Sequence, residues 1–216
     1  FIAFGALIAT ALSKNHYNNQ TVNLYIPENG LISINPPLTA RRIGSLSTRT
    51  THPFFLGKLN ELFVNIGLPV KLLNPYQFKT KGEMIVDCQN QTLLKKVAVD
   101  TVSCGKWKRS GIQCGRCVPC LIRRASFNAA TYNDTTPYQF PVLNDVIKNP
   151  NNRDDLMSMI VALQSLENVS NKNIWVARSG SLPLEKTERQ SIIDTVLRGM
   201  GEVKNYLQTQ NLDVTV

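Results

Sequence analysis

Four cysteines in one short stretch of the chain have the spacing of a metal site: Cys104, Cys114, Cys117 and Cys120. Zinc holds four thiolates in a tetrahedron at about 2.3 Å, so the C-x9-C-x2-C-x2-C pattern predicts one structural zinc ion with no position left for a catalytic water. Gly115 allows the tight turn that this geometry needs. An iron–sulfur cluster is the alternative, because C-x2-C-x2-C also begins the ferredoxin pattern. Four unrelated buried thiols would not be expected to cluster in this way.

The cysteine segment is also strongly basic. No carboxylate accompanies its cations, which are Lys106, Lys108, Arg109, Arg116, Arg123 and Arg124. These charges either offset the negative charge of a zinc tetrathiolate or bind an anion such as a nucleotide phosphate, a substrate carboxylate or a nucleic acid. The sequence leaves both interpretations open.

Composition restricts the class of protein. The chain has 216 residues, 43% of them hydrophobic, and a net charge of +9, which suits a globular protein with a real core. Five cysteines, four of them clustered, argue against a disulfide scaffold and favour a reducing, cytoplasmic location. We expect the remaining thiol, Cys88, to be a small buried apolar group.

The chain opens on an apolar run at residues 1–12. This run is shorter than the ~20 residues that span a bilayer and lacks the features of a signal peptide, so we expect a core helix and no membrane association. Because the chain begins with Phe1 inside an apolar pattern, we expect it to be the C-terminal part of a longer protein.

The next elements predict a βαβ unit and hence an α/β fold. Strands are expected at residues 21–27 and 69–75, with an amphipathic helix between them that begins near Pro53. Such units are nearly always parallel, and ligands of open parallel sheets bind beyond the carboxyl ends of the strands. Those ends are residues 28–30 and 74–75, where we expect a site.

The remainder of the chain is predicted to be helical at residues 152–168 and 185–208. Apolar residues of the second helix recur on one face, which indicates core packing or, alternatively, a surface for a partner helix. They are Ile192, Ile193, Val196, Leu197, Met200, Val203, Tyr206 and Leu207. We divide the chain into an α/β part (1–100), a four-cysteine segment (101–135) and a helical region (136–216).

Several motifs, in this order, resemble the QueC-like family, the relatives of 7-cyano-7-deazaguanine synthase among the PP-loop ATPases. The similarity covers about residues 1–135 and is nearest to the branch found in bacterial anti-phage systems of the Qat and CBASS types. The motifs are ENG (28–30), NPPLTARR (35–42), STRTTHP (47–53), NPYQFKTKGE (74–83) and the cysteine block (103–124).

The resemblance implies a Rossmann-like PP-loop fold, a structural zinc, and an enzyme that uses ATP with Mg²⁺ to adenylate the carboxylate of 7-carboxy-7-deazaguanine. The activated carboxylate would then become an amide and a nitrile, or be transferred to the N-terminus of a partner protein. The Ser-Gly-Gly-x-Asp-Ser pyrophosphate loop of this superfamily is absent from the sequence and would precede Phe1. We therefore expect this chain alone to hydrolyse no ATP.

Two candidate catalytic residues follow from the resemblance. Lys81 can contact a phosphate or the acyl-adenylate, or it can be a solvated lysine at a helix start. The flanking Thr80 and Glu83 have the T-x-x-E form of a capping box, which explains both without catalysis. His52 is a candidate proton shuttle, but a histidine before a proline at a helix start also suits a cap or a packed ring.

Candidate substrate-binding residues lie at the predicted rim of the sheet. Glu28 and Asn29 can read a guanine-like edge, because a carboxylate accepts from an N–H and amino pair, or they can serve only the turn. Arg41, Arg42 and Arg49 can bind a carboxylate or phosphate through bidentate guanidinium contacts.

Two other classes of function stay open. The first is a zinc-containing nucleic-acid-binding module, although only Trp107 and Phe127 provide aromatic rings along the basic segment. The second is a non-catalytic protein-interaction subunit. The expected partners are thus a deazaguanine and ATP, an acceptor protein, or a second copy in a homodimer, with nucleic acid less favoured.

Overall fold

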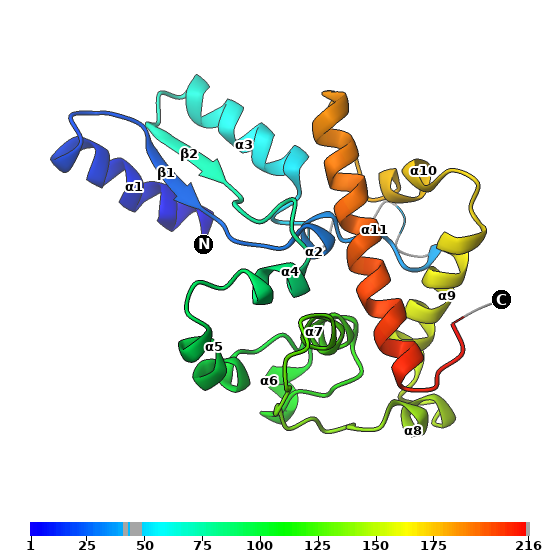
Figure 1. The fold of residues 1–216 in the computed structure, drawn as a ribbon. Helices are drawn as coiled ribbons and strands as arrows, with labels where there is room; N and C mark the ends of the chain where they lie inside the picture. The colour runs from blue at the N-terminus through cyan, green and yellow to red at the C-terminus, as the bar shows by residue number, and fades with distance from the viewer. Residues whose placement is uncertain (41–42, 44–48, 215–216) are drawn as a thin grey trace.

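The computed structural model describes residues 1–40, 43 and 49–214. Arg41 and Arg42, two of the predicted binding residues, lie outside the described residues. The described chain is a mixed α/β structure that is mostly helical, with a small parallel sheet on one side and helices packed around a long C-terminal helix on the other (Figure 1).

The predicted parallel βαβ unit is confirmed. Strands β1 (Val22–Tyr25) and β2 (Val70–Leu73) pair in parallel, with Val22 opposite Val70. Helix α3 (Pro53–Asn65) lies between them in the sequence, and helix α1 (Ile2–His16) precedes β1. Both helices contribute to one apolar cluster with the sheet, whose buried members are Ala6, Ala9, Leu56, Phe63, Val70 and Leu72.

The carboxyl ends of the two strands lie side by side, as predicted from the parallel pairing. The Glu28 backbone N–H donates to Asn74 Oδ1 at 3.2 Å, and Asn74 Nδ2 donates to the Glu28 carbonyl at 2.8 Å. This reciprocal pair fixes the start of the next helix relative to the end of β2.

Most of the other helices in the described part of the chain are short, and among them only α7, α9 and α11 exceed eight residues. In chain order they are α2 (Gly30–Ile34), α4 (Lys81–Val86), α5 (Gln91–Val97), the 3-10 turn η2 (Ala98–Asp100), α6 (Trp107–Ser110), α7 (Val118–Ala129), α8 (Leu143–Lys148), α9 (Asp154–Asn168), α10 (Lys172–Ala177) and α11 (Lys186–Thr209).

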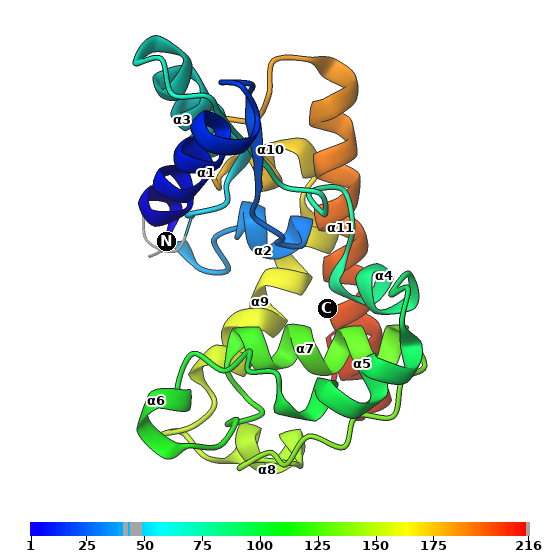
Figure 2. The same ribbon diagram turned by 90° about the vertical axis from the view of Figure 1, so that its left-hand side faces the viewer.

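Helix α11 forms the centre of the larger core, which confirms the core-packing interpretation of its apolar stripe. Every member of the stripe is buried except Leu197, which is partly buried against the same core. Helices α2, α7, α9 and α10 contribute to this core around α11, and both views show α7 below α2 (Figures 1 and 2). Leu31 and Ile34 of α2 belong to this core together with Leu121 of α7, so the core draws on all three predicted segments.

Helix α4 begins with the predicted capping box. Thr80 Oγ1 accepts from the Glu83 backbone N–H at 3.0 Å, and Glu83 Oε2 accepts from the Thr80 N–H at 2.9 Å. The cap makes Lys81 the first residue of the helix. The direction of α4 is therefore set by a local sequence signal as well as by packing.

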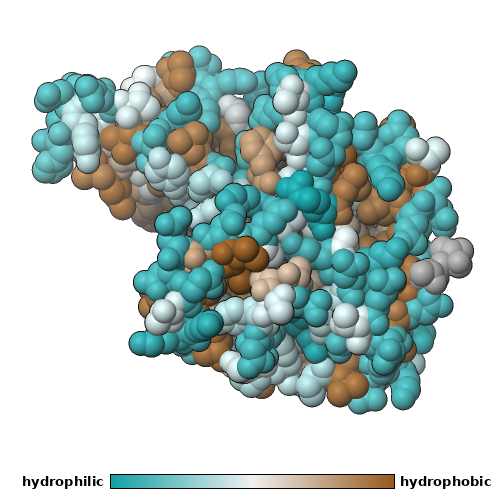
Figure 3. All heavy atoms as spheres, viewed as in Figure 1, coloured by the Kyte–Doolittle hydropathy of each residue, from teal (hydrophilic) through white to brown (hydrophobic). Residues whose placement is uncertain are grey.

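One expectation about burial is wrong. Cys88 is only half-buried, because it lies in the turn that follows α4, with its Sγ 3.7 Å from the Asn90 carbonyl oxygen. The expectation of a core helix at residues 1–12 holds only in part. Ala6 and Ala9 of α1 are buried against the sheet cluster, whereas most of the large apolar side chains of this helix are exposed, and apolar surface gathers over this part of the molecule (Figure 3). In the described part of the chain, no helix combines the length and the apolar character needed to cross a bilayer.

Candidate functional site

The four predicted metal ligands converge on one point. Their sulfur atoms all lie within 4.8 Å of one another, and the four residues are buried. Cys114 Sγ is 3.9 Å from Cys120 Sγ, and Cys117 Sγ is 3.9 Å from Cys104 Sγ. A tetrahedron with 2.3 Å metal–sulfur bonds has an edge of about 3.8 Å, whereas a disulfide requires about 2.05 Å. The cluster can therefore hold a metal ion such as zinc.

Backbone N–H groups also point at the sulfur atoms. Cys104 Sγ accepts from the N–H groups of Lys106 and Cys114, each at 3.3 Å, and Cys114 Sγ accepts from the Cys117 N–H at 3.3 Å. Gly115 has a φ of +78°, which permits this turn as the spacing predicted. These donors stabilise thiolate charge, which is the form of cysteine that ligates a metal.

Hydrogen bonds among the thiols shift their pKa values in opposite directions. Hydrogen bonds from Cys117 and Cys120 lower the pKa of Cys114, while the bond to Cys114 raises the pKa of Cys117 to about 11. The bond to Cys114, together with burial, likewise raises the pKa of Cys120. Metal binding must therefore release protons from the cluster.

The three arginines of the basic segment bind backbone carbonyls, a role the sequence did not indicate. Arg123 is buried and donates to the carbonyls of Thr101 and Ala98 at 3.1 and 2.6 Å. Arg124 donates to the Pro141 carbonyl at 2.6 Å, and Arg116 donates to the Asn152 carbonyl. These arginines tie the loops around the cysteine cluster together.

Lys106, in turn, pairs with Asp155 at 3.1 Å. Four of the six cations are thus engaged within the protein, and Lys108 and Arg109 are the exposed ones. This arrangement weakens the interpretation of the segment as a nucleic-acid-binding surface, which requires several free cations along one face.

A cleft of about 490 Å³ lies next to the cysteine cluster. Its size falls in the usual range for small-molecule sites. Its charged lining residues are Glu28, Lys81 and Asp155, and its other polar ones are Asn35, Thr39, Ser103 and Ser158. Its apolar lining residues are Leu31, Ile32, Pro36, Leu38, Val102, Val118, Pro119, Ile122, Met159 and Met200.

Glu28 is the acidic group at the strand end of the cleft. Its Oε1 accepts from the backbone N–H and the side-chain Nδ2 of Asn29, at 3.0 and 2.9 Å. Burial raises the pKa of Glu28, and the Lys81 charge and the Asn29 bonds oppose that shift. Asn29 thus orients the Glu28 carboxylate, and the pKa of that carboxylate depends on the Lys81 charge in the cleft.

Lys81 projects from the capped start of α4 into the same cleft. Burial lowers the pKa of its ammonium group, while the charges of Glu28 and Cys120 raise it and that of Arg123 lowers it. Its Nζ donates to Ser103 Oγ at 3.1 Å. The structure therefore excludes the interpretation of Lys81 as a solvated surface lysine.

The other described candidates do not line the cleft. Asn29 is buried and caps α2, where its Oδ1 accepts from the Ile32 N–H at 3.1 Å. His52 is a buried cap of α3. Its Nδ1 accepts from the Phe54 N–H at 3.3 Å, and its Nε2 has no hydrogen-bond partner among the described residues. Burial, followed by the Arg49 charge, lowers the pKa of His52 to about 4.

Arg49 and His52 instead lie beside the loop between α10 and α11. A Cβ at Gly180 would be 3.5 Å from His52 Nε2 and 3.7 Å from Arg49 Nη1. The structure therefore brings together Glu28 and Lys81 of the predicted site and gives His52 a capping role at the start of α3.

Ser103 and Asp155 are two of the polar cleft residues that were not predicted as site residues. Ser103 had only its position before Cys104 as a signal, and Asp155 had only its place in the first turn of α9. Neither signal distinguishes a site residue from an ordinary loop or helix-start residue.

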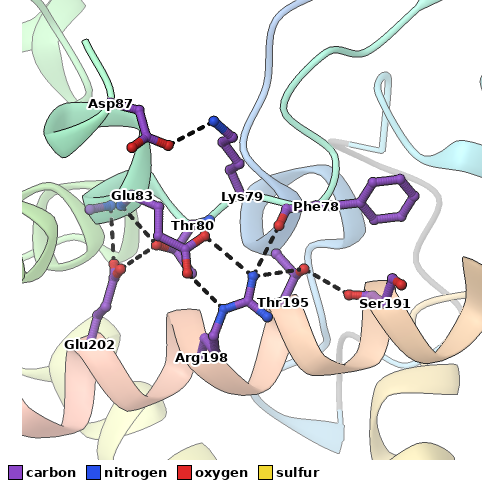
Figure 4. A network of polar contacts seen from close by, with 10 residues as sticks. Phe78, Lys79, Thr80, Glu83, Asp87, Ser191, Thr195, Arg198 and Glu202 are labelled. Carbon is purple, nitrogen blue, oxygen red and sulfur yellow. Dashed lines mark hydrogen bonds and ion pairs between the residues drawn. The ribbon is translucent and has the colours of Figure 1, made fainter.

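A polar network fastens α4, and with it Lys81, to α11 (Figure 4). The Thr80 hydroxyl donates to Glu202, whose other oxygen accepts from the Gly82 N–H at 3.3 Å. Arg198 donates to Glu83 Oε1 at 2.7 Å and to the Phe78 carbonyl at 3.0 Å. Both ends of the first turn of α4 are therefore held by the long C-terminal helix.

No family model, curated protein or solved structure matches this chain in the comparisons made with it.

Proposed function

We propose that this chain belongs to an ATP-dependent enzyme that activates the carboxylate of a 7-deazaguanine. The observation that carries the proposal is that Glu28 and Lys81 line one cleft with apolar walls. A carboxylate and an ammonium group in such a cleft suit a flat heterocycle that has hydrogen-bond donors at one edge and an anionic substituent at another.

7-Carboxy-7-deazaguanine has both features. Glu28 would accept from its ring N–H and amino group, which is the geometry in which a carboxylate reads a guanine-like edge. Lys81 would pair with its carboxylate, and such a pair would offset the cost of burying the ammonium group. The apolar side chains of Ile32, Leu38 and Met159 would contact the ring faces.

The chemistry proposed for the intact enzyme is adenylation. The ligand carboxylate attacks the α-phosphorus of ATP, the bond to the β-phosphate breaks, and Mg²⁺-bound pyrophosphate leaves. An amine then attacks the acyl carbon and AMP leaves. A PP-loop fold is part of this proposal, supported by the parallel β1–β2 unit and the motif resemblance. A role in anti-phage defence and a protein amine as the acceptor are supported by the resemblance alone.

The zinc proposed for the cysteine cluster has a structural task. Four thiolates complete its coordination, so the ion supplies no Lewis-acid chemistry in this scheme. Its ligands instead fix the segments that carry Ser103, Val118 and Pro119 to the cleft wall.

Calorimetric titration of the zinc-loaded chain tests the proposal. We expect 7-carboxy-7-deazaguanine to bind at least about tenfold more tightly than its 7-cyano analogue or guanine, because a charge-assisted bond is lost without the carboxylate. Equal, weak binding of all three compounds would contradict the proposed ligand.

A further inference from the structure

One wall of the cleft and the cysteine cluster are built from the same segments of the chain. Val102 and Ser103 directly precede Cys104, and Val118 and Pro119 lie between Cys117 and Cys120. A metal that draws the four sulfur atoms together therefore also sets the shape of one side of the cleft.

Ser103 makes the polar connection between the two features. Its Oγ accepts from Lys81 Nζ at 3.1 Å, and its backbone N–H donates to Gln113 Oε1 at 3.1 Å. Gln113 is buried and precedes Cys114, and its Nε2 donates to the Thr101 carbonyl at 3.1 Å. The backbone of Ser103 is therefore held by its hydrogen bond to Gln113 and by its peptide bond to Cys104, both in the segment that carries the metal ligands.

We propose that Ser103 is a positioning residue that transmits the geometry of the metal site to Lys81. The inference rests on the proposed role of Lys81 in ligand binding. With the metal bound, Ser103 holds the Lys81 ammonium against the cleft wall. When the metal is removed, the segment 101–130 unfolds and Lys81 loses its fixed acceptor. Metal binding and ligand binding are then coupled, and each must strengthen the other by the same factor.

The test is the rate at which a small amine-reactive reagent modifies Lys81 in the full chain, measured by peptide mass spectrometry and normalised to the exposed Lys95. Ser103→Ala should raise the rate about three- to tenfold, the factor set by one hydrogen bond, at unchanged zinc content. Ser103→Thr, which keeps the hydroxyl, should stay close to the wild-type rate. Ser158→Ala, at another serine of the cleft, is the matched control and should have no effect.

Chelation of the zinc provides a second arm that needs no variant. It should raise the Lys81 rate at least as much as Ser103→Ala does, and Ser103→Ala should add nothing further in chelated protein, because both changes break the same connection. An unchanged or lower Lys81 rate in zinc-loaded Ser103→Ala, or after chelation, would overturn the proposal. None of these measurements uses a deazaguanine, so failure of the proposed ligand would leave the result interpretable.

Discussion

The ammonium group of Lys81 donates a hydrogen bond to the hydroxyl of Ser103, across 3.1 Å and 22 positions of the sequence. Lys81 is the first residue of a capped helix, and Ser103 is the residue before the first cysteine of the metal cluster. The bond therefore joins the capped helix to the cysteine segment, and both residues line one cleft.

The metal content of the cysteine cluster can be tested by single substitution. We expect one tightly bound zinc per chain. Cys117→Ser should lower the zinc content, whereas Cys88→Ser, at the half-buried thiol outside the cluster, should leave it unchanged. Structural zinc contributes about 10–16 kcal/mol of apparent binding free energy, so chelation should unfold at least residues 101–130. Elemental analysis that finds iron with labile sulfide would favour the cluster alternative instead.

The contact between α4 and α11 leaves no room for a side chain at position 82. A Cβ at Gly82 would lie 2.5 Å from Glu202 Oε1 and 3.2 Å from the Ala129 Cβ. Gly82→Ala should displace Glu202 from its bonds and lower the free energy of unfolding by about 1–3 kcal/mol. At Gly201 an added Cβ meets nothing within 4 Å, so Gly201→Ala is the control. Denaturant unfolding curves in which both variants lose equal stability would contradict this account of the contact.

His52 should make stability depend on pH. Because its pKa is lowered to about 4 in the folded chain and is about 6.5 when unfolded, the unfolded chain binds the proton first as the pH falls. The contribution is fully present above pH ~6.5 and is lost between about pH 6.5 and 4, amounting to about 3 kcal/mol.

His52→Asn keeps a good helix cap but cannot titrate in this range. Its free energy of unfolding should therefore fall less steeply than that of the wild type over the same interval. The comparison cancels the loss of metal at low pH, which affects both proteins alike. Two parallel stability curves would show that His52 carries no such linkage.

Local signals in the sequence were sufficient to predict several elements of the structure. The T-x-x-E pattern at Thr80 and Glu83 predicted the capping box, since both of its hydrogen bonds form within one turn. The apolar period of 185–208 predicted the buried face of α11. The cysteine spacing predicted the convergence of the four sulfur atoms, because a metal site of this kind is specified by a few residues close in sequence.

The cleft could not be predicted in the same way, because its contacts join distant segments. The Thr80–Glu202 bond spans 122 positions, and no local pattern marks Glu202 as the partner of α4. The contacts of the basic residues could not be predicted from the sequence either. Charge alone suggested either compensation of thiolate charge or an anionic ligand for Arg123, whereas the fold surrounds this side chain with backbone carbonyls. The division of the chain at residues 100 and 135 stays a prediction.

The central claim is that Lys81 binds the ligand carboxylate and Glu28 binds its guanine-like edge. The most direct test measures how much each residue contributes to the binding affinity. The zinc-loaded chain is titrated with 7-carboxy-7-deazaguanine and with its 7-cyano analogue, for the wild type, Lys81→Ala, Glu28→Gln and the control Lys79→Ala, whose lysine pairs with Asp87 on the surface. The account predicts that Lys81→Ala removes the preference of about tenfold for the carboxylate. It also predicts that Glu28→Gln lowers the affinity for both compounds by a similar factor. Lys79→Ala should change the affinity for neither compound. A carboxylate preference that survives unchanged in Lys81→Ala would contradict it.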